Sequence, residues 1–180
     1  NINMSHRELH VSAHFVLSDF VECGETQQRE NTPNLPAIPE SIAAIEQTAK
    51  LILDPVVEQF GSIELTYGLA TRALLAHVEK RIAPRYDQHA AHELNKGGRR
   101  LCNRDGFAVD LRSANTSSLL IAQFIVERLP FDRLYYYGSD RPVHVSYGPE
   151  HTKQVCVMRF NSEHDRWFPQ RTLIENFLAL

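Results

Sequence analysis

The sequence predicts a single α+β domain in which two or three helices precede an antiparallel run of strands. Two observations predict this class. In the first half of the chain, apolar residues recur at three- and four-residue spacing, which is the pattern of helices packed against a core. In the second half, short segments alternate apolar and polar residues, which is the pattern of strands with one buried face.

The length and composition of the chain exclude several classes of protein. The 180 residues can bury a sizeable core, and the formal net charge of −3 disfavours a strongly basic nucleic-acid binder. No apolar run approaches the roughly 20 residues that cross a bilayer, so we expect neither a membrane nor a nucleic-acid partner. The three cysteines lack CxxC spacing and the start lacks a signal peptide, which predicts a cytoplasmic protein.

The predicted elements follow one another with short connections, except for one polar segment. In chain order, they are an extended piece and helical turn at 9–24, a loop at 25–39, a helix at 39–60, a strand at 63–67, a helix at 70–82, a strand at 107–111, a helix at 119–129, and strands at 133–137, 142–146 and 154–160. The longest helix contains Pro55, so we expect a kink or break near Asp54. Residues 84–106 are polar and contain a double-glycine turn signal.

We divide the chain into three parts on the basis of these elements. Residues 1–8 are a disordered or artificially added start, and residues 9–160 form the domain. Residues 161–180 form a C-terminal tail with helical periodicity near its end.

Three segments combine histidine or aspartate with a neighbouring turn or strand, in a chain that holds nine histidines. These segments are Asp87-Gln88-His89-Ala90-Ala91-His92-Glu93, Gly106-Phe107-Ala108-Val109-Asp110 and Asp140-Arg141-Pro142-Val143-His144-Val145-Ser146. A catalytic zinc ion takes three protein ligands and keeps one position for water. Two histidines and a carboxylate from separate segments meet that requirement. Solvated loop histidines and a core histidine are the alternative interpretation.

Several motifs, taken in order, resemble one family of zinc peptidases. The most specific are Gly106-x-Ala108-x-Asp110 and Val143-His144-Val145, and the others are His14–Phe20, Asn31-Thr32-Pro33, Leu53–Gly61 and Leu65–Ala70. Together they resemble the M15 zinc D-Ala-D-Ala carboxypeptidases, in particular their phage-like and bacterial branch, over roughly residues 14–147. The resemblance implies the Hedgehog/DD-peptidase fold, an antiparallel sheet with helices on one side, and zinc as the cofactor.

The resemblance also implies three metal ligands, which are His89, Asp110 and His144. In the family, the first ligand lies seven residues before the aspartate, where this chain has Asn103, a poor zinc ligand. An insertion at about 90–103 would reconcile the two patterns, because a loop whose ends stay close costs little extra entropy for its length. His92 is the alternative first ligand, and loss of the metal is the alternative for the whole site.

The catalytic base and the substrate contacts differ from the family pattern. Many members have a glutamate three residues before the last ligand, where this chain has Arg141, which cannot accept a proton. Asp140 is the nearest carboxylate and the first candidate for the base, and Glu93 is the second. The family arginine that anchors a substrate carboxylate is replaced by Ala70. Arg72 and Arg141 are therefore candidate substrate-binding residues, with a basic side chain of the insertion as the alternative.

The sequence thus predicts a zinc-dependent hydrolase that cleaves a peptide or amide bond of a small substrate. The alternative is a divergent M15-like domain that keeps its metal but has no peptidase activity. Such a domain would serve as a binding module or act on a substrate that does not come from the cell wall.

Overall fold

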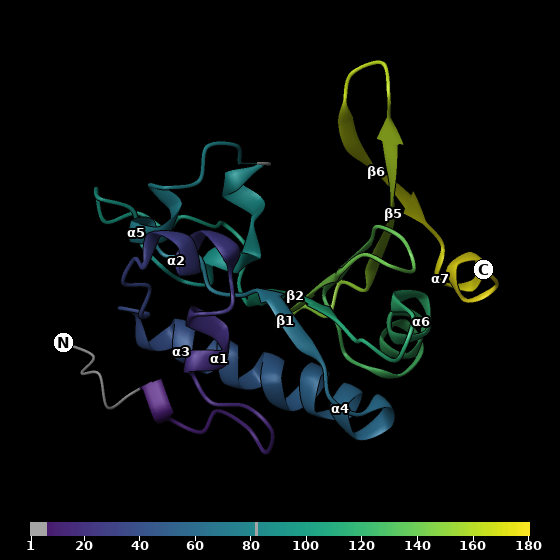
Figure 1. Ribbon diagram of the computed structural model, residues 1–180, viewed down its shortest axis with the longest axis horizontal. Coiled ribbons are helices and arrows are strands. Elements are labelled where there is room, and N and C mark those ends of the chain that lie inside the picture. Colours follow the sequence, from purple (N-terminus) through teal and green to yellow (C-terminus); the bar gives the residue numbers. More distant parts are fainter. Residues whose placement is uncertain (1–6, 82) are drawn as a thin grey trace.

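The computed structural model describes residues 7–81 and 83–180 and shows a mixed α/β fold with one six-stranded sheet (Figure 1). The helical elements are α1 (Ser18–Val21), α2 (Glu25–Glu30), α3 (Pro39–Thr48), the π-helical segment η2 (Ala49–Leu53), α4 (Asp54–Phe60), α5 (Arg72–Leu75), the 3₁₀ turns η3 (Pro84–Tyr86) and η4 (Gln88–Ala90), α6 (Ser118–Arg128) and α7 (Ile174–Leu178). The strands are β1 (Glu64–Tyr67), β2 (Phe107–Arg112), β3 (Arg133–Tyr136), β4 (Val143–Tyr147), β5 (Gln154–Asn161) and β6 (Arg166–Thr172).

The strands lie in the order β1-β2-β4-β3-β5-β6. Every neighbouring pair is antiparallel except β3 and β5, which are parallel. The prediction of a fully antiparallel sheet is therefore wrong at this pair. The cause is the connection at residues 148–153, which carries the chain from β4 to the other side of β3 and so gives β5 the direction of β3.

The long helix that the sequence predicts at 39–60 forms as three consecutive elements, α3, η2 and α4. Pro55 is the second residue of α4 and directly follows the π-helical segment. Proline cannot donate the usual helical hydrogen bond and its ring crowds the preceding turn, and a π-helical turn is wider there. The expected interruption near Asp54 is thus a change in helix type rather than a break in the chain.

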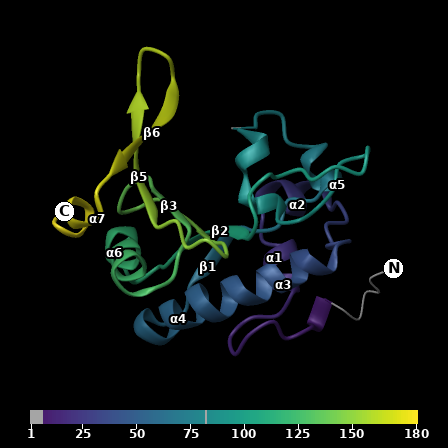
Figure 2. The ribbon, with the colours of Figure 1, turned by 180° about the vertical axis from the view of Figure 1, so that it is seen from behind.

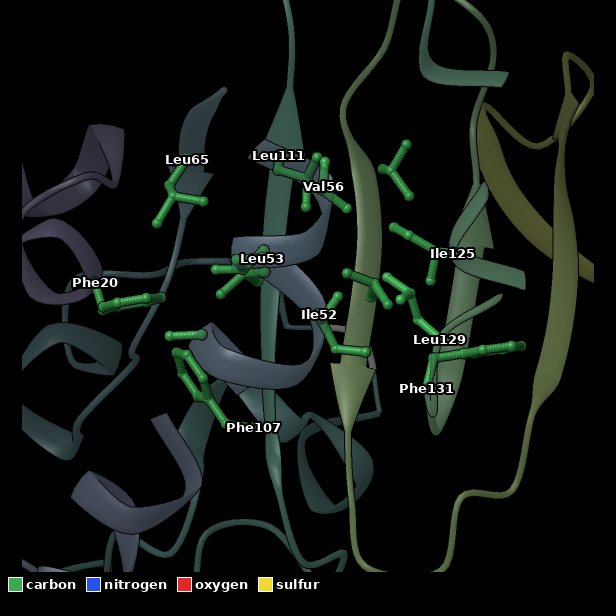
Figure 3. Close-up of a cluster of buried hydrophobic side chains, with 14 of the residues drawn as sticks. Phe20, Ile52, Leu53, Val56, Leu65, Phe107, Leu111, Ile125, Leu129 and Phe131 are labelled. Atoms are coloured by element: carbon green, nitrogen blue, oxygen red, sulfur yellow. The ribbon is translucent and has the colours of Figure 1, made fainter. Parts of the chain in front are cut away.

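The core lies between this helix and one face of the sheet (Figure 3). Ile52 and Val56 come from the helix, and Phe107 and Leu111 come from β2. Because neighbouring residues of a strand point to opposite faces, Asp110 lies on the other face of β2. We call this second face, opposite to α3, α4 and α6, the open face of the sheet.

Two predictions about the helices need correction. The helix predicted at 70–82, of which residue 82 lies outside the described residues, is only one turn, α5. Its apolar residues pack in a small cluster apart from the main core and give no long amphipathic face to support a longer helix. The loop predicted at 25–39 contains the short helix α2, which has no buried residue and therefore leaves no apolar stripe in the sequence.

The C-terminal segment completes the sheet and the core. β6 pairs with β5 over the whole of its length, and Phe177 of α7 is fully buried. Gln123 of α6 donates a side-chain hydrogen bond to the carbonyl oxygen of Phe177. The β5–β6 hairpin projects beyond the rest of the sheet in both views (Figures 1 and 2).

The other end of the chain is described only in part. Of the start predicted at 1–8, residues 1–6 lie outside the described residues, and Arg7 forms an ion pair with Glu22. Within the described ranges, no helix has the length and apolar character needed to cross a membrane.

Candidate metal centre

Two of the predicted ligands are placed by strand register. Asp110 of β2 lies directly opposite His144 of β4 in the antiparallel pairing. Val109 and Val145, their neighbours in sequence, are buried in the core, so both ligands project from the open face. Nδ1 of His144 lies 2.9 Å from Oδ1 of Asp110.

The third predicted ligand comes from the 3₁₀ turn η4 (Gln88–Ala90). Nε2 of His89 lies 3.2 Å from the same Oδ1 of Asp110. One ligand atom from each of His89, Asp110 and His144 lies within 4.8 Å of the other two. The alternative ligand His92 is not in this group, and its backbone N–H donates to Oγ of Ser41.

The His89 ring is held in one orientation, with a proton on its Nδ1. Its Nδ1 lies 2.8 Å from the carbonyl oxygen of Gly68, which can only accept a hydrogen bond, so Nδ1 carries the proton. In the protonated ring Nε2 donates a hydrogen bond to Asp110, and in the neutral ring the lone pair of Nε2 is available to a metal. The backbone N–H of His89 donates to Oδ1 of Asp87, and its carbonyl accepts from Ala70. A histidine ligand whose second nitrogen is bound to a carbonyl is typical of metal sites.

Two glycines allow the close backbone contacts behind the site. A Cβ atom on Gly68 would overlap the carbonyl oxygen of Phe20. A Cβ atom on Gly106, which has a φ of +105°, would overlap the carbonyl oxygen of Tyr147. Gly68 thus positions the carbonyl that binds His89, and Gly106 allows the start of β2 to approach the end of β4.

A buried asparagine, which the sequence analysis did not identify, holds the loop after Gly68. Nδ2 of Asn34 donates to the carbonyl of Leu69 over 2.7 Å, and its Oδ1 accepts from the backbone N–H of Thr71 over 3.0 Å. The only available signal was the Asn-x-Pro loop, which precedes Asn34 but does not include it. This side chain helps to fix the loop that carries the Gly68 carbonyl.

Gln88 anchors the η4 turn from the other side. Its Nε2 donates to the carbonyl oxygen of Asp105 and to Oδ2 of the buried Asp132, both over 2.9 Å. The residue before the ligand is thereby connected to β3, since Asp132 directly precedes that strand. This contact joins segments far apart in the sequence, and no local pattern indicates it.

Aromatic rings lie on both sides of the ligands. The ring of Tyr67 lies 4.3 Å from that of His89, and the ring of Tyr135 lies 5.2 Å from that of His144. An irregularity in the β1–β2 register between Leu65 and Tyr67 is what places Tyr67 opposite Asp110. Regular alternation puts Leu65 and Tyr67 on the same face, so the sequence could not predict this contact.

The site is partly buried and open to solvent on one side. The exposed fraction of the side chain is 5% for His89, 29% for Asp110 and 19% for His144. Burial alone would lower the pKa of His89, but the charge of Asp110 and their hydrogen bond outweigh it and raise that pKa to about 9. Burial likewise opposes ionisation of Asp110, but both histidines hold its pKa below the usual range. Asp110 is therefore a carboxylate at neutral pH.

The neighbouring Cys23 does not compete with these ligands as a thiolate. Burial raises the pKa of its thiol to about 12, so the thiol stays protonated at neutral pH in the absence of a metal. The group that could hold a metal therefore consists of two nitrogen ligands and one oxygen ligand.

Glu93, the second candidate for the base, lies at the start of α3. Its Oε1 accepts from the backbone N–H of Ala37, and its Oε2 accepts from the N–H of Ile38 and from Oγ of Ser41. Both carboxylate oxygens are thus engaged in holding the N-terminus of a helix. A buried carboxylate bound in this way is not available as a base, and we do not retain Glu93 in that role.

The remaining predicted residues lie outside the ligand group. Asp140 is exposed in the turn between β3 and β4, and the guanidinium carbon of the neighbouring Arg141 lies 5.1 Å from the centre of the Trp167 ring. Arg72 is exposed at the start of α5. The roles of Asp140 as base and of Arg72 and Arg141 in substrate binding stay predictions.

Comparison with known proteins finds no matching family model, no matching curated protein and no matching solved structure. The chemistry of the site is therefore argued from its own geometry. Two imidazole nitrogens and one carboxylate oxygen, open to solvent on one side, fit a divalent metal that keeps a position for an exchangeable ligand.

Proposed function

We propose that the protein is a zinc-dependent hydrolase that resembles the M15 D,D-carboxypeptidases and cleaves a peptide or amide bond with a metal-activated water. The observation that carries the proposal is the convergence of His89, Asp110 and His144 on the open face. The hydrogen bond from His89 to Gly68 strengthens it, because it prepares Nε2 as a ligand.

The ligand set supports zinc as the metal. Three protein ligands drawn from histidine and a carboxylate are typical of catalytic zinc, whereas structural zinc sites are closed by four. When bound there, zinc supplies a water of lowered pKa and polarises the carbonyl group of the substrate. The chain holds the ligands in place from two strands and one anchored turn, which keeps their geometry fixed.

Asp140 is the residue that we propose as the base. It would take the proton of the attacking water and pass it to the leaving amine. Its turn is attached to α6, because Ser118 donates from its N–H to the carbonyl of Ser139 and from its Oγ to the carbonyl of Arg141. The carboxylate is therefore carried by an anchored turn that leads directly into the strand of His144.

The proposal is tested by hydrolysis of a panel of peptides and amides that includes a D-Ala-D-Ala peptide. We expect activity in the zinc-loaded protein, none after removal of zinc, and a loss of more than about 100-fold in His144→Ala. His164→Ala is the matched control, because His164 is exposed in the β5–β6 turn, and it should retain full activity. Equal activity of His144→Ala and the unmodified protein would contradict the proposal.

The base is tested separately with Asp140→Asn. We expect kcat to fall by about 10²- to 10⁴-fold while zinc content is unchanged. Asp165→Asn, in the exposed β5–β6 turn, is the matched control. If Asp140→Asn hydrolyses the substrate at the normal rate, Asp140 is not the base.

A second candidate function is a domain that holds zinc without peptidase activity. One observation favours it: among the described residues, the ligand group contains no carboxylate besides Asp110, and Arg141 stands where many family members have their glutamate. A stoichiometric zinc protein that hydrolyses nothing in the panel would support this candidate over the hydrolase.

A further inference from the structure

Beyond His144, the open face carries a cluster of aromatic residues and one arginine. Tyr135 lies opposite His144 in the β3–β4 pairing and packs against its ring. Tyr137 directly follows β3, and its ring lies 5.3 Å from that of Trp167 in β6. The β5–β6 hairpin therefore brings Trp167, which lies near the chain end, to the same region as Asp110 and His144.

Trp167 is enclosed by three side chains. Tyr137 meets its ring edge-on, Phe160 of β5 packs at 5.4 Å, and the guanidinium of Arg141 lies over the ring at 5.1 Å. The cation and the indole face attract each other, which favours this position of the guanidinium.

Arg141 has no ion-pair partner in the part of the chain that the structure describes. Its backbone is nevertheless fixed, because its carbonyl accepts from Oγ of Ser118 over 2.5 Å and its N–H donates to the carbonyl of Gly138. A guanidinium on a fixed backbone that lies over a ring and has no carboxylate partner among the described residues suits an anion that binds through two parallel hydrogen bonds.

Tyr137 connects this cluster with the metal ligands. Burial raises the pKa of Tyr137, the charge of Asp110 raises it further, and the charge of Arg141 opposes the shift. The geometry gives the same connection, because Tyr135 packs against His144, Tyr137 follows two residues later and contacts Trp167, and Trp167 contacts Arg141.

We propose that Arg141, seated on Trp167, binds an anionic group of the substrate, a carboxylate or a phosphate, at a distance from the bond that is cleaved. The position of that bond rests on the proposed function, but the binding of an anion does not. The substrate class is accordingly an amide or peptide with an acidic group, and β6 supplies part of its binding surface.

The test uses the fluorescence of Trp167, the single tryptophan of the chain. The probes are an N-acetylated dipeptide with a free carboxylate, the same dipeptide as its C-terminal amide, and inorganic phosphate. Each is titrated into the full chain with and without zinc. We expect a saturable signal and a dissociation constant at least about tenfold lower for one of the two anions than for the amide.

Arg141→Gln should weaken binding of that anion by at least about tenfold, whereas Arg141→Lys, which keeps the charge but not the planar fork, should weaken it less. The matched control is Arg128→Gln, because Arg128 lies over the Phe124 ring at 5.9 Å on α6, on the helix side of the sheet. That variant should bind the anion like the unmodified protein. Calorimetry repeats the comparison, since Arg141→Gln also changes the surroundings of Trp167.

Two results would overturn the inference: equal affinity for the amide and both anions, or unchanged anion affinity in Arg141→Gln. Failure of the proposed function looks different. If the protein binds no zinc but still binds the anion more tightly than the amide through Arg141, the anion site is supported and the proposed hydrolase function is contradicted. If the protein is a zinc-dependent hydrolase but binds the amide as tightly as the anion, only the proposed anion site is contradicted.

Discussion

The two halves of the candidate metal centre, the strand pair Asp110 and His144 and the turn residue His89, are positioned by different means. Asp110 and His144 face each other through the hydrogen-bonded register of two central strands. His89 comes from a one-turn 3₁₀ segment and owes its place to the carbonyl of Gly68 and the carboxylate of Asp87. The position of the strand half can be inferred from the local alternation of apolar and polar residues. The position of the turn half depends on contacts between segments far apart in the sequence.

This difference has a consequence for mutation. The strand half should fail only when the sheet itself is disturbed, because the backbone ladder holds it. The turn half should be sensitive to residues that never touch the metal, since a small shift of the η4 turn moves Nε2 of His89 out of reach. Substitution of the glycines, a change of pH and substitution of Asp87 should therefore affect the two halves differently.

The largest effect is expected for alanine at the two close-packed glycines. Gly106→Ala combines a strained φ with overlap at Tyr147 and should lower the free energy of unfolding by about 4 kcal/mol, and Gly68→Ala should cost about 3 kcal/mol. Gly97→Ala, in an exposed turn with room for a Cβ, should change it by less than about 0.5 kcal/mol. Urea denaturation measures all three. If Gly106→Ala were as stable as Gly97→Ala, the close contact between the start of β2 and the end of β4 would not require a glycine.

The next effect concerns pH in the protein without zinc. The pKa of His89 is about 9 in the folded state and near 6.5 when unfolded. Its protonated pair with Asp110 should therefore stabilise the fold fully below pH 6.5, and this stabilisation, about 3 kcal/mol at most, should be lost as the pH rises to about 9.

Chemical denaturation of the unmodified protein and of His89→Gln across this range measures the difference between them. The zinc affinity should rise over the same range, because binding releases the His89 proton. A stability difference that does not change with pH would show that His89 is not paired with Asp110.

The smallest effect is expected for Asp87→Ala, which removes the acceptor of the His89 backbone N–H. Zinc affinity should fall by about 10- to 100-fold, while the strand pair is unaffected. Glu64→Ala is the control, because it removes an exposed ion pair with Arg112 beside the strand half, a kind of pair that contributes little. Calorimetric zinc titration compares the two variants, and equal affinities would mean that Asp87 does not position the turn.

Much of the sheet could be predicted because its strands show alternation, but not all of it. β6 contains Pro169 and is mostly exposed, so it has no apolar face that marks a strand. The register shift before Tyr67 and the parallel pairing of β3 with β5 are properties of the folded chain and leave no local pattern.

For the site, the sequence proposed the three residues that converge, but it left His89 and His92 as alternatives. Spacing could not decide between them, since both lie in the same polar segment. The decision comes from the Gly68 carbonyl, which meets His89, and from Ser41, which binds the backbone of His92. The surroundings of Glu93 could not be predicted for a similar reason, because its partners at the start of α3 lie more than 50 residues away.

The metal site itself is tested by zinc titration of three proteins: the unmodified chain, His89→Ala and His92→Ala. We expect one zinc ion per chain for the unmodified protein and for His92→Ala, and an affinity lower by more than about 100-fold for His89→Ala. Absence of stoichiometric zinc in the unmodified protein, or undiminished binding by His89→Ala, would contradict the proposed metal site.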